Sequence, residues 1–208
     1  MMLFALLKKD FLIVKKYVLI MLVVIALIPP VMRWRTPEFT GVFGFILSVI
    51  FGVFILLQYV SLKEYQFPKA VTLLCATPFS RKAIVSSKYI FCMAIYAICC
   101  IVFELETLFM PELGTSDIKL FAFMFLIVSV FIGIYLPIQY KTKFAFGVII
   151  MASPFILPLL MRAGSLNLNF LSMFSPYLVY GGIVLIGFAI LAISASLSIK
   201  IYDKADLA

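Results

Sequence analysis

The sequence predicts an all-α integral membrane protein, a single transmembrane domain over residues 1–208 that crosses the bilayer six times. Of the 208 residues, 65% are hydrophobic and only 12% are charged, and the mean hydropathy is +1.22. Soluble domains have about 45–50% apolar and about 25% charged residues, so the excess apolar surface must face lipid. Because about 20 apolar residues span a bilayer, six spans leave room only for short loops.

Six apolar stretches of helical length alternate with polar segments. The fifth contains Pro154 and Pro158, so we expect a kinked or broken helix there. The predicted spans are residues 17–32, 41–62, 89–108, 120–138, 144–161 and 177–199.

Residues 1–16 are predicted to form an amphipathic helix in the cytoplasmic interface of the membrane. The four lysines of this segment lie off its apolar stripe, and no small-residue cleavage site follows, so it is not a signal peptide. The alternative is a cytoplasmic extension of the first span. The stripe consists of Leu3, Leu7, Phe11, Val14 and Val18.

The distribution of basic residues predicts the orientation in the membrane. Thirteen of the seventeen Lys and Arg residues lie in the N-terminal segment, the 63–88 loop, the 139–143 turn and the C-terminal tail. Basic loops stay in the cytoplasm. We therefore expect a multi-pass plasma-membrane protein with both termini in the cytoplasm.

No catalytic or metal site is predicted. The chain has no histidine, which removes a common metal ligand and general base, and no P-loop, HExxH or GxSxG motif. The four cysteines form no CxxC pair. The net charge of +8 is attributed to anchoring against anionic lipid rather than to nucleic-acid binding. We expect no enzyme activity and no cofactor on this chain.

The polar segment 63–88 is predicted to hold a short helix outside the membrane. Pro68 suits the first turn of a helix, and Thr77-Pro78 ends it. Its apolar stripe finds no partner within so small a protein, which favours docking on a cytoplasmic partner; the alternative is that the stripe lies on the membrane surface. The stripe consists of Val71, Leu74 and Cys75.

Ser80 is predicted to be the N-cap of the next helix. That helix starts at Arg81 and runs into the third span.

Glu104 and Glu106 are the acidic residues embedded in an apolar run. At a rise of about 1.5 Å per residue, Glu104 lies about 22 Å from Tyr89, in the outer half of the bilayer. Carboxylates in a membrane are costly and therefore candidates for a cargo or ion pathway. The alternative is an ion pair near the outer surface. The candidate partners are Arg33, Arg35 and Arg162.

The 63–88 loop resembles that of the ABC type-2 permease family. Glu64, the segment Leu73-Leu74-Cys75-Ala76-Thr77-Pro78, and Ser80-Arg81-Lys82 followed by Ile84 and Lys88 are similar to an "E…LL..P.SR..I…K" string of small bacterial permeases. The tail Ser198 to Lys204 also resembles the family's usual ending.

The resemblance implies a half-transporter that pairs with a second copy or a related permease. Each copy would dock on a separate ATPase subunit, which would bind ATP and Mg. A coupling helix, roughly residues 64–76, would insert into that ATPase, and residues 162–176 would re-enter the membrane from outside. The implied coupling residues are Glu64, Pro68, Val71, Leu74, Cys75 and Ala76.

We therefore predict that the chain is the permease subunit of an ATP-driven bacterial exporter. Its expected substrate is amphipathic or hydrophobic, and a peptide is the main candidate. Small members of the resembled family export phenol-soluble modulins and bacteriocin-like peptides. Two alternatives stay open. One is a membrane immunity or sensing protein that binds a toxic peptide without transport. The other is an ion-coupled carrier that uses Glu104.

Overall fold

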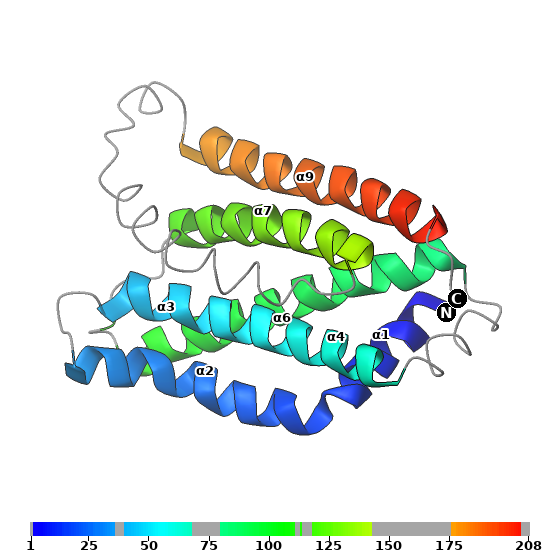
Figure 1. Cartoon of the computed structure of the whole chain (residues 1–208). Coiled ribbons are helices and arrows are strands. Elements are labelled where there is room, and N and C mark those ends of the chain that lie inside the picture. The colour runs from blue at the N-terminus through cyan, green and yellow to red at the C-terminus, as the bar shows by residue number, and fades with distance from the viewer. Residues whose placement is uncertain are drawn as a thin grey trace. The chain divides into compact units, whose positions relative to one another are not determined.

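The computed structural model describes residues 2–35, 40–67, 80–110, 113, 118–142 and 176–204, and no strand occurs among them. The chain divides into two compact units, Met1–Met124 with Leu207–Ala208, and Phe125–Asp206. The helices are α1 (Met2–Ile13), α2 (Lys15–Arg35), α3 (Thr40–Ile50), η2 (Phe51–Ile55), α4 (Leu56–Gln66), α6 (Arg81–Phe109), α7 (Ile118–Thr142) and α9 (Pro176–Lys204), and Figure 1 labels all of them except η2.

Five helical segments in the described part of the chain are long and apolar enough to cross a membrane. They correspond to the first, second, third, fourth and sixth predicted spans. The predicted fifth span, 144–161, and the predicted re-entrant segment, 162–176, lie outside the described residues. The five segments are Lys15–Met32, Gly44–Glu64, Arg81–Phe109, Ile118–Lys141 and Val179–Asp203.

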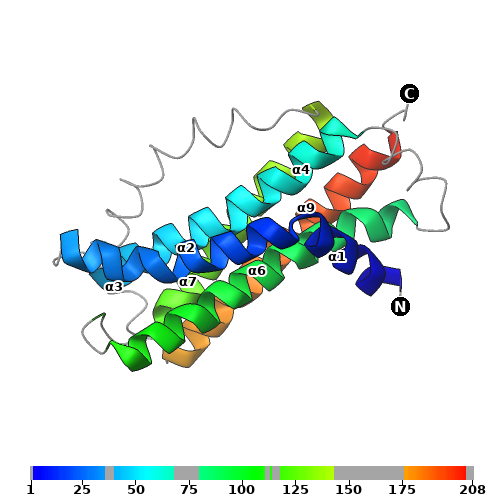
Figure 2. The same cartoon turned by 90° about the horizontal axis from the view of Figure 1, so that it is seen from below.

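The N-terminal helix α1 is separate from the first span, because Val14 forms a turn between α1 and α2. In Figure 2, α1 lies beside α6, and the rings of Phe11 and Phe91 meet edge to face at 5.0 Å. The predicted apolar stripe is only partly right, since Leu3 is 43% exposed. The buried face instead has a four-residue spacing and consists of Leu6, Asp10 and Val14.

The second span contains a wide π-helical turn, η2, between α3 and α4. A Cβ atom on Gly52, in this turn, would lie 2.8 Å from Ile25 Cδ1 and 2.9 Å from Cys99 Sγ. The glycine therefore permits η2 to approach α2 and α6 closely. Close approach through small residues is the usual way in which membrane helices pack.

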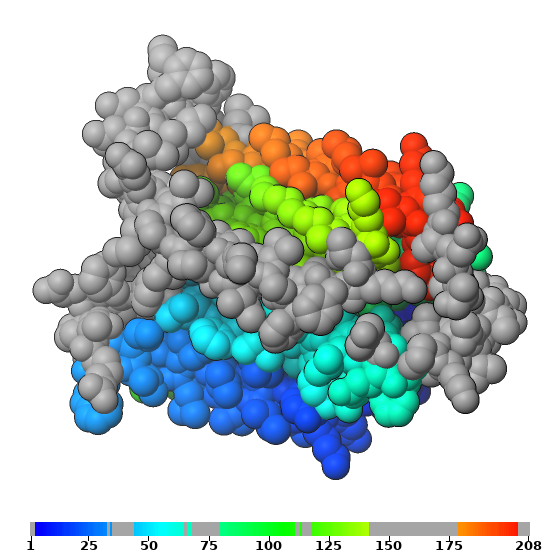
Figure 3. Space-filling view, viewed as in Figure 1, coloured from blue at the N-terminus to red at the C-terminus, as the bar shows by residue number. Residues whose placement is uncertain are grey.

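Large apolar side chains are exposed along α2, whose atoms are blue in Figure 3. A bilayer offers such side chains an environment as apolar as a protein core, so their exposure in the chain carries no cost in lipid. The exposed side chains are Leu19, Ile20, Val23, Leu27 and Val31.

Within the first unit, a serine of α3 supplies a hydrogen-bond donor that a proline removes from the backbone of α2. Pro29 lies inside α2 and has no N–H, so the carbonyl of Ile25, four residues earlier, loses its usual helical donor. The Ser48 hydroxyl of α3 donates to this carbonyl oxygen at 3.2 Å. An unsatisfied carbonyl is expensive in lipid, so the serine allows the proline to remain in the span.

The second unit repeats this arrangement. Pro137 lies inside α7 and frees the carbonyl of Gly133, to which the Ser194 hydroxyl of α9 donates at 2.7 Å. Close packing supports the contact, because a Cβ on Gly187 of α9 would lie 2.6 Å from the Phe125 ring of α7. The two helices of this unit are therefore joined by small residues and by one hydrogen bond to a proline-freed carbonyl.

We predict that Ser194→Ala destabilises the chain by about 0.6–1.7 kcal/mol, the range measured for hydrogen bonds between membrane helices. In a Pro137→Ala background the same change should cost close to nothing, because an alanine at this position supplies the missing N–H. The free energy of unfolding in detergent measures both effects. Ser196→Ala is the matched control, since Ser196 donates at 2.9 Å to Ala192 within its own helix. An equal cost of Ser194→Ala in both backgrounds would contradict the explanation.

Candidate coupling site

Two helices flank residues 68–79, which lie outside the described residues and hold most of the predicted coupling helix, residues 64–76. The helix α4 ends at Gln66 and α6 begins at Arg81. Ser80 is the N-cap of α6, as predicted, because its hydroxyl accepts a hydrogen bond from the Ala83 N–H at 3.2 Å. Of the predicted coupling residues, Glu64 lies in the last turn of α4. The others, which lie outside the described residues, are Pro68, Val71, Leu74, Cys75 and Ala76.

An ion pair joins the two helices that flank this segment. The Lys88 ammonium of α6 donates to the Glu64 carboxylate of α4. Lys88 is only 3% exposed. The partners are 24 residues apart in sequence, so the pair joins α4 to α6 across the loop between them.

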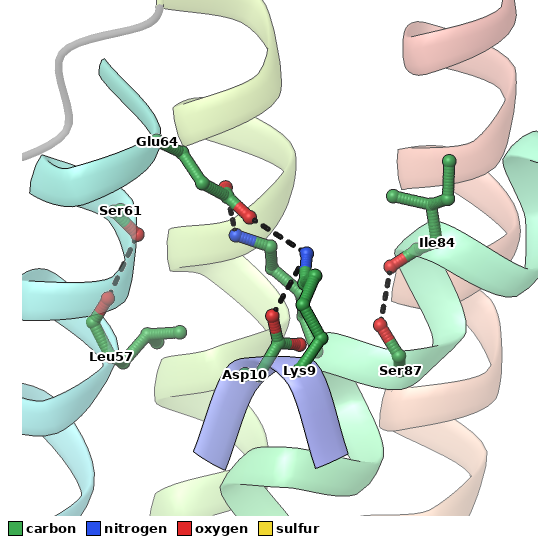
Figure 4. A network of polar contacts seen from close by, with 8 residues as sticks. Lys9, Asp10, Leu57, Ser61, Glu64, Ile84 and Ser87 are labelled. Atoms are coloured by element: carbon green, nitrogen blue, oxygen red, sulfur yellow. Dashed lines mark hydrogen bonds and ion pairs between the residues drawn. The ribbon is translucent and has the colours of Figure 1, made fainter. Parts of the chain in front are cut away.

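The helix α1 adds a second ammonium and a second carboxylate to this pair. Lys9 Nζ lies 3.6 Å from Glu64 Oε1 and 3.1 Å from Asp10 Oδ1. Figure 4 shows Lys9 and Asp10 on α1 turned toward Glu64. We call Lys9, Asp10, Glu64 and Lys88 the charge cluster. Its formal charges cancel, which is the condition under which charged groups tolerate burial.

Asp10 is the least satisfied member of the charge cluster. It is 1% exposed; its Oδ1 atom lies 3.1 Å from the Lys9 ammonium, and its Oδ2 atom accepts no hydrogen bond among the described residues. Burial raises the pKa of the Asp10 carboxyl above its usual value, and Glu64 adds to the rise. The attraction of Lys88 and Lys9 opposes this pKa shift and does not cancel it.

Neighbouring hydroxyls do not enter the charge cluster. The Ser61 hydroxyl donates to the Leu57 carbonyl and the Ser87 hydroxyl to the Ile84 carbonyl, each at 2.8 Å within its own helix (Figure 4). The cluster is therefore held by charge attraction between three helices.

Aromatic rings and a lysine lie close to the end of α4. The Tyr17 and Tyr59 rings are 3.7 Å apart between centroids. Lys63 Nζ lies 5.5 Å from the centre of the Tyr59 ring and 5.9 Å from that of Phe67. Tyrosine and lysine gather where membrane helices leave the hydrocarbon region, so this group marks a membrane boundary near the charge cluster.

The predicted pathway carboxylates, Glu104 and Glu106, lie in the last turns of α6. Glu104 is exposed, whereas Glu106 is partly buried. Both carboxylate oxygens of Glu106 are inaccessible to water and have no hydrogen-bond partner among the described residues. The described part of the chain gives no position for the three arginine side chains considered as partners, so that alternative stays open.

Three members of the charge cluster were not among the predicted site residues. Lys88 was counted as a loop residue, although it opens an apolar run, and Asp10 lies midway between Leu6 and Val14 on one helical face. The position of a carboxylate within an apolar helix face was therefore the feature of the sequence that could have indicated a buried charge at Asp10. Among the described residues no group of three potential metal ligands occurs, and Cys92, Cys99 and Cys100 are free thiols.

The apolar helices and the ion-paired helix ends define a multi-pass membrane protein. Residues 5–203 match the family described as ABC-2 family transporter protein, and the chain belongs to this family. It is therefore a membrane component of an ABC-2 transporter, the type of component that pairs with ABC ATPase subunits. No curated protein and no solved structure matches the chain.

We predict that Lys88→Met destabilises the chain by about 3–5 kcal/mol, the usual cost of leaving buried charge unpaired. It would leave Lys9 as the one cation of the charge cluster, beside the two carboxylates of Glu64 and Asp10. Glu64→Gln in addition to Lys88→Met should recover part of that loss, since the pair is then removed as a unit. The measurement is the free energy of unfolding in detergent. Lys82→Met, at an exposed position of α6, is the control. Strictly additive losses would argue against the pair.

We also predict a pH dependence that comes from Asp10. Its folded-state pKa is raised, so the native chain binds the proton more tightly than the unfolded chain. The resulting stability is present below the ordinary pKa near 4 and is lost as the pH rises through the raised value. The thermal stability of the parent chain relative to that of Asp10→Asn should therefore decline as the pH rises through this range, because the other titrating groups are common to both chains. Identical profiles would refute the assignment. Asp203→Asn, at an exposed position, is the control.

Proposed function

We propose that the chain is the permease subunit of an ATP-driven exporter in a bacterial plasma membrane, with an amphipathic peptide as cargo. Two permease chains, identical or related, would form the path, and each would dock on a separate ATPase subunit that binds ATP and Mg. The observation that carries the proposal is the Glu64–Lys88 ion pair, because it joins the two membrane helices that flank the predicted docking segment.

The ion pair would transmit motion of the docking segment to the membrane helices. When ATP closes the ATPase subunits, the docking segment, residues 68–79, is displaced. Because Glu64 and Lys88 tie together α4 and α6 at the ends of that segment, both helices move as one. Lys9 and Asp10 add α1 to the moving group. The long spans then carry the motion across the bilayer.

Glu106 supports a cargo that carries positive charge. Its carboxylate oxygens have no hydrogen-bond partner among the described residues, and an ammonium or guanidinium group would satisfy them.

The proposed orientation, with both termini in the cytoplasm, rests on the positive-inside rule. The Tyr17, Tyr59 and Lys63 group supports a membrane boundary at the charge cluster.

We predict that two kinds of substitution separate docking from coupling. Leu74→Asp should abolish recovery of the ATPase subunit when the permease is purified from native membranes in mild detergent. The Glu64→Gln/Lys88→Met double variant should still recover it, but should lose most of the stimulation of ATP hydrolysis by an added cationic amphipathic helical peptide. Matched controls are Leu207→Asp, in the C-terminal tail, and Lys82→Met in α6.

Recovery of the parent chain without any ATPase subunit would overturn the proposal and favour the immunity or sensing alternative. Peptide uptake into vesicles without ATP, abolished by Glu104→Gln, would favour the ion-coupled carrier instead. Stimulation that is unchanged in the Glu64/Lys88 double variant would refute the coupling route while leaving the export function in place.

A further inference from the structure

The second membrane span meets α6 at two places. In α3, the ring of Phe45 lies 4.7 Å from that of Phe103, measured between centroids. In α4, the Glu64 carboxylate accepts a hydrogen bond from the Lys88 ammonium. Phe45 and Glu64 therefore lie on one side of the span, the side that faces α6.

A regular α-helix would not place these two residues on the same side. Five whole turns take about 18 residues, so the residue aligned with Phe45 would be Lys63. Glu64, one residue further, would point about 100° away from α6. A regular second span would therefore bring a third ammonium group, instead of a carboxylate, toward Lys9 and Lys88.

The π-helical turn η2 corrects this register. It comprises Phe51–Ile55 and lies between the two contacts. The hydrogen bonds of a π-helix reach one residue further than those of an α-helix. One such turn therefore absorbs the extra residue and brings Glu64 onto the side of Phe45.

Lys63 lies on another side of α4. Its ammonium donates to Gln66 Oε1 at 3.1 Å and lies 5.5 Å from the centre of the Tyr59 ring. Lys63 is therefore not a member of the charge cluster, although a regular helix would direct it there.

Gly52 provides the space that η2 requires. A Cβ atom at this position would lie 2.8 Å from Ile25 Cδ1 and 2.9 Å from Cys99 Sγ. The end of the Ile25 side chain can rotate away, but Cys99 is fully buried. A larger residue would therefore push η2 away from α6, between the two places where the span meets that helix.

We propose that η2 is a positioning element of the coupling site, which selects Glu64 rather than Lys63 as the partner of Lys88. Gly52 is the positioning residue that permits the wide turn. One extra residue in the span thus decides the sign of the charge that α4 presents to α6. The importance of this choice for coupling rests on the proposed function, whereas its effect on the ion pair does not.

Changes in the length of η2 test the proposal. The measurement is the coupling free energy between positions 64 and 88 in the purified full chain. It is obtained from the free energies of unfolding in detergent of the parent, Glu64→Gln, Lys88→Met and the double variant. A general loss of stability cancels in this cycle, so the coupling reports the pair itself.

We expect the coupling to survive deletion of Ile55, the exposed last residue of η2. Without this residue a regular α-helix already places Phe45 and Glu64 on the same side. Ile55→Ala, which keeps the length of the span, is the matched control and should leave the coupling unchanged. Loss of the coupling upon deletion would overturn the proposal.

An alanine inserted after Ile55 should abolish the coupling, because it turns α4 by about 100° and moves Lys63 into the place of Glu64. Lys63→Glu/Glu64→Lys in the inserted chain should restore a favourable coupling, now between positions 63 and 88. The same exchange in the parent chain should make the coupling unfavourable, since two ammonium groups then meet. Favourable coupling between positions 64 and 88 in the inserted chain, or no gain from the exchange, would refute the register argument.

Gly52→Val separates positioning from packing. It should lower stability with or without Ile55, because Cys99 lies against Gly52. The coupling should weaken only in the parent chain, since the shortened chain no longer needs the wide turn. Equal loss of coupling in both chains would remove Gly52 from the proposal. None of these measurements involves an ATPase subunit or a cargo, so failure of the export function would leave them unchanged.

Discussion

The ammonium group of Lys88 is almost completely removed from solvent, and a charge in that position is tolerated only with an opposite charge beside it. Glu64 supplies that charge from α4, and Asp10 lies close enough on α1 to add to it. Three helices, α1, α4 and α6, are therefore held together by one electrostatic condition. Glu64 lies in the last turn of α4, and Lys88 lies seven residues after Arg81, the first residue of α6.

A different condition governs the helices inside the bilayer, where each backbone carbonyl needs a donor. Pro29 and Pro137 each remove one, and a serine on a neighbouring helix replaces it. The same solution occurs in both units, for the carbonyls of Ile25 and Gly133. Prolines are the usual sites of helix kinks, and both of these lie in the last third of their spans, Pro29 in Lys15–Met32 and Pro137 in Ile118–Lys141.

The helix α1 carries two different faces. One of them completes the charge cluster, and the other is apolar and cationic. The same short segment therefore exposes both the Lys8 ammonium and the large apolar side chains of Phe4 and Leu12.

Composition and hydropathy were enough to predict an all-helical membrane protein, five of its spans, a separate N-terminal helix and the Ser80 cap, because these depend on local patterns that lipid and backbone geometry impose. The loop string, with Glu64 and Lys88 in it, indicated the ABC-2 family. Sequence periodicity misassigned part of the α1 stripe, because a helix with two apolar surfaces carries two overlapping patterns. Only the tertiary structure decided that Lys88 lies beside Glu64 and Asp10. It also decided that the Ser48 and Ser194 hydroxyls donate to the carbonyls that Pro29 and Pro137 leave without a donor. In both cases helix packing brings together segments that are far apart in the sequence.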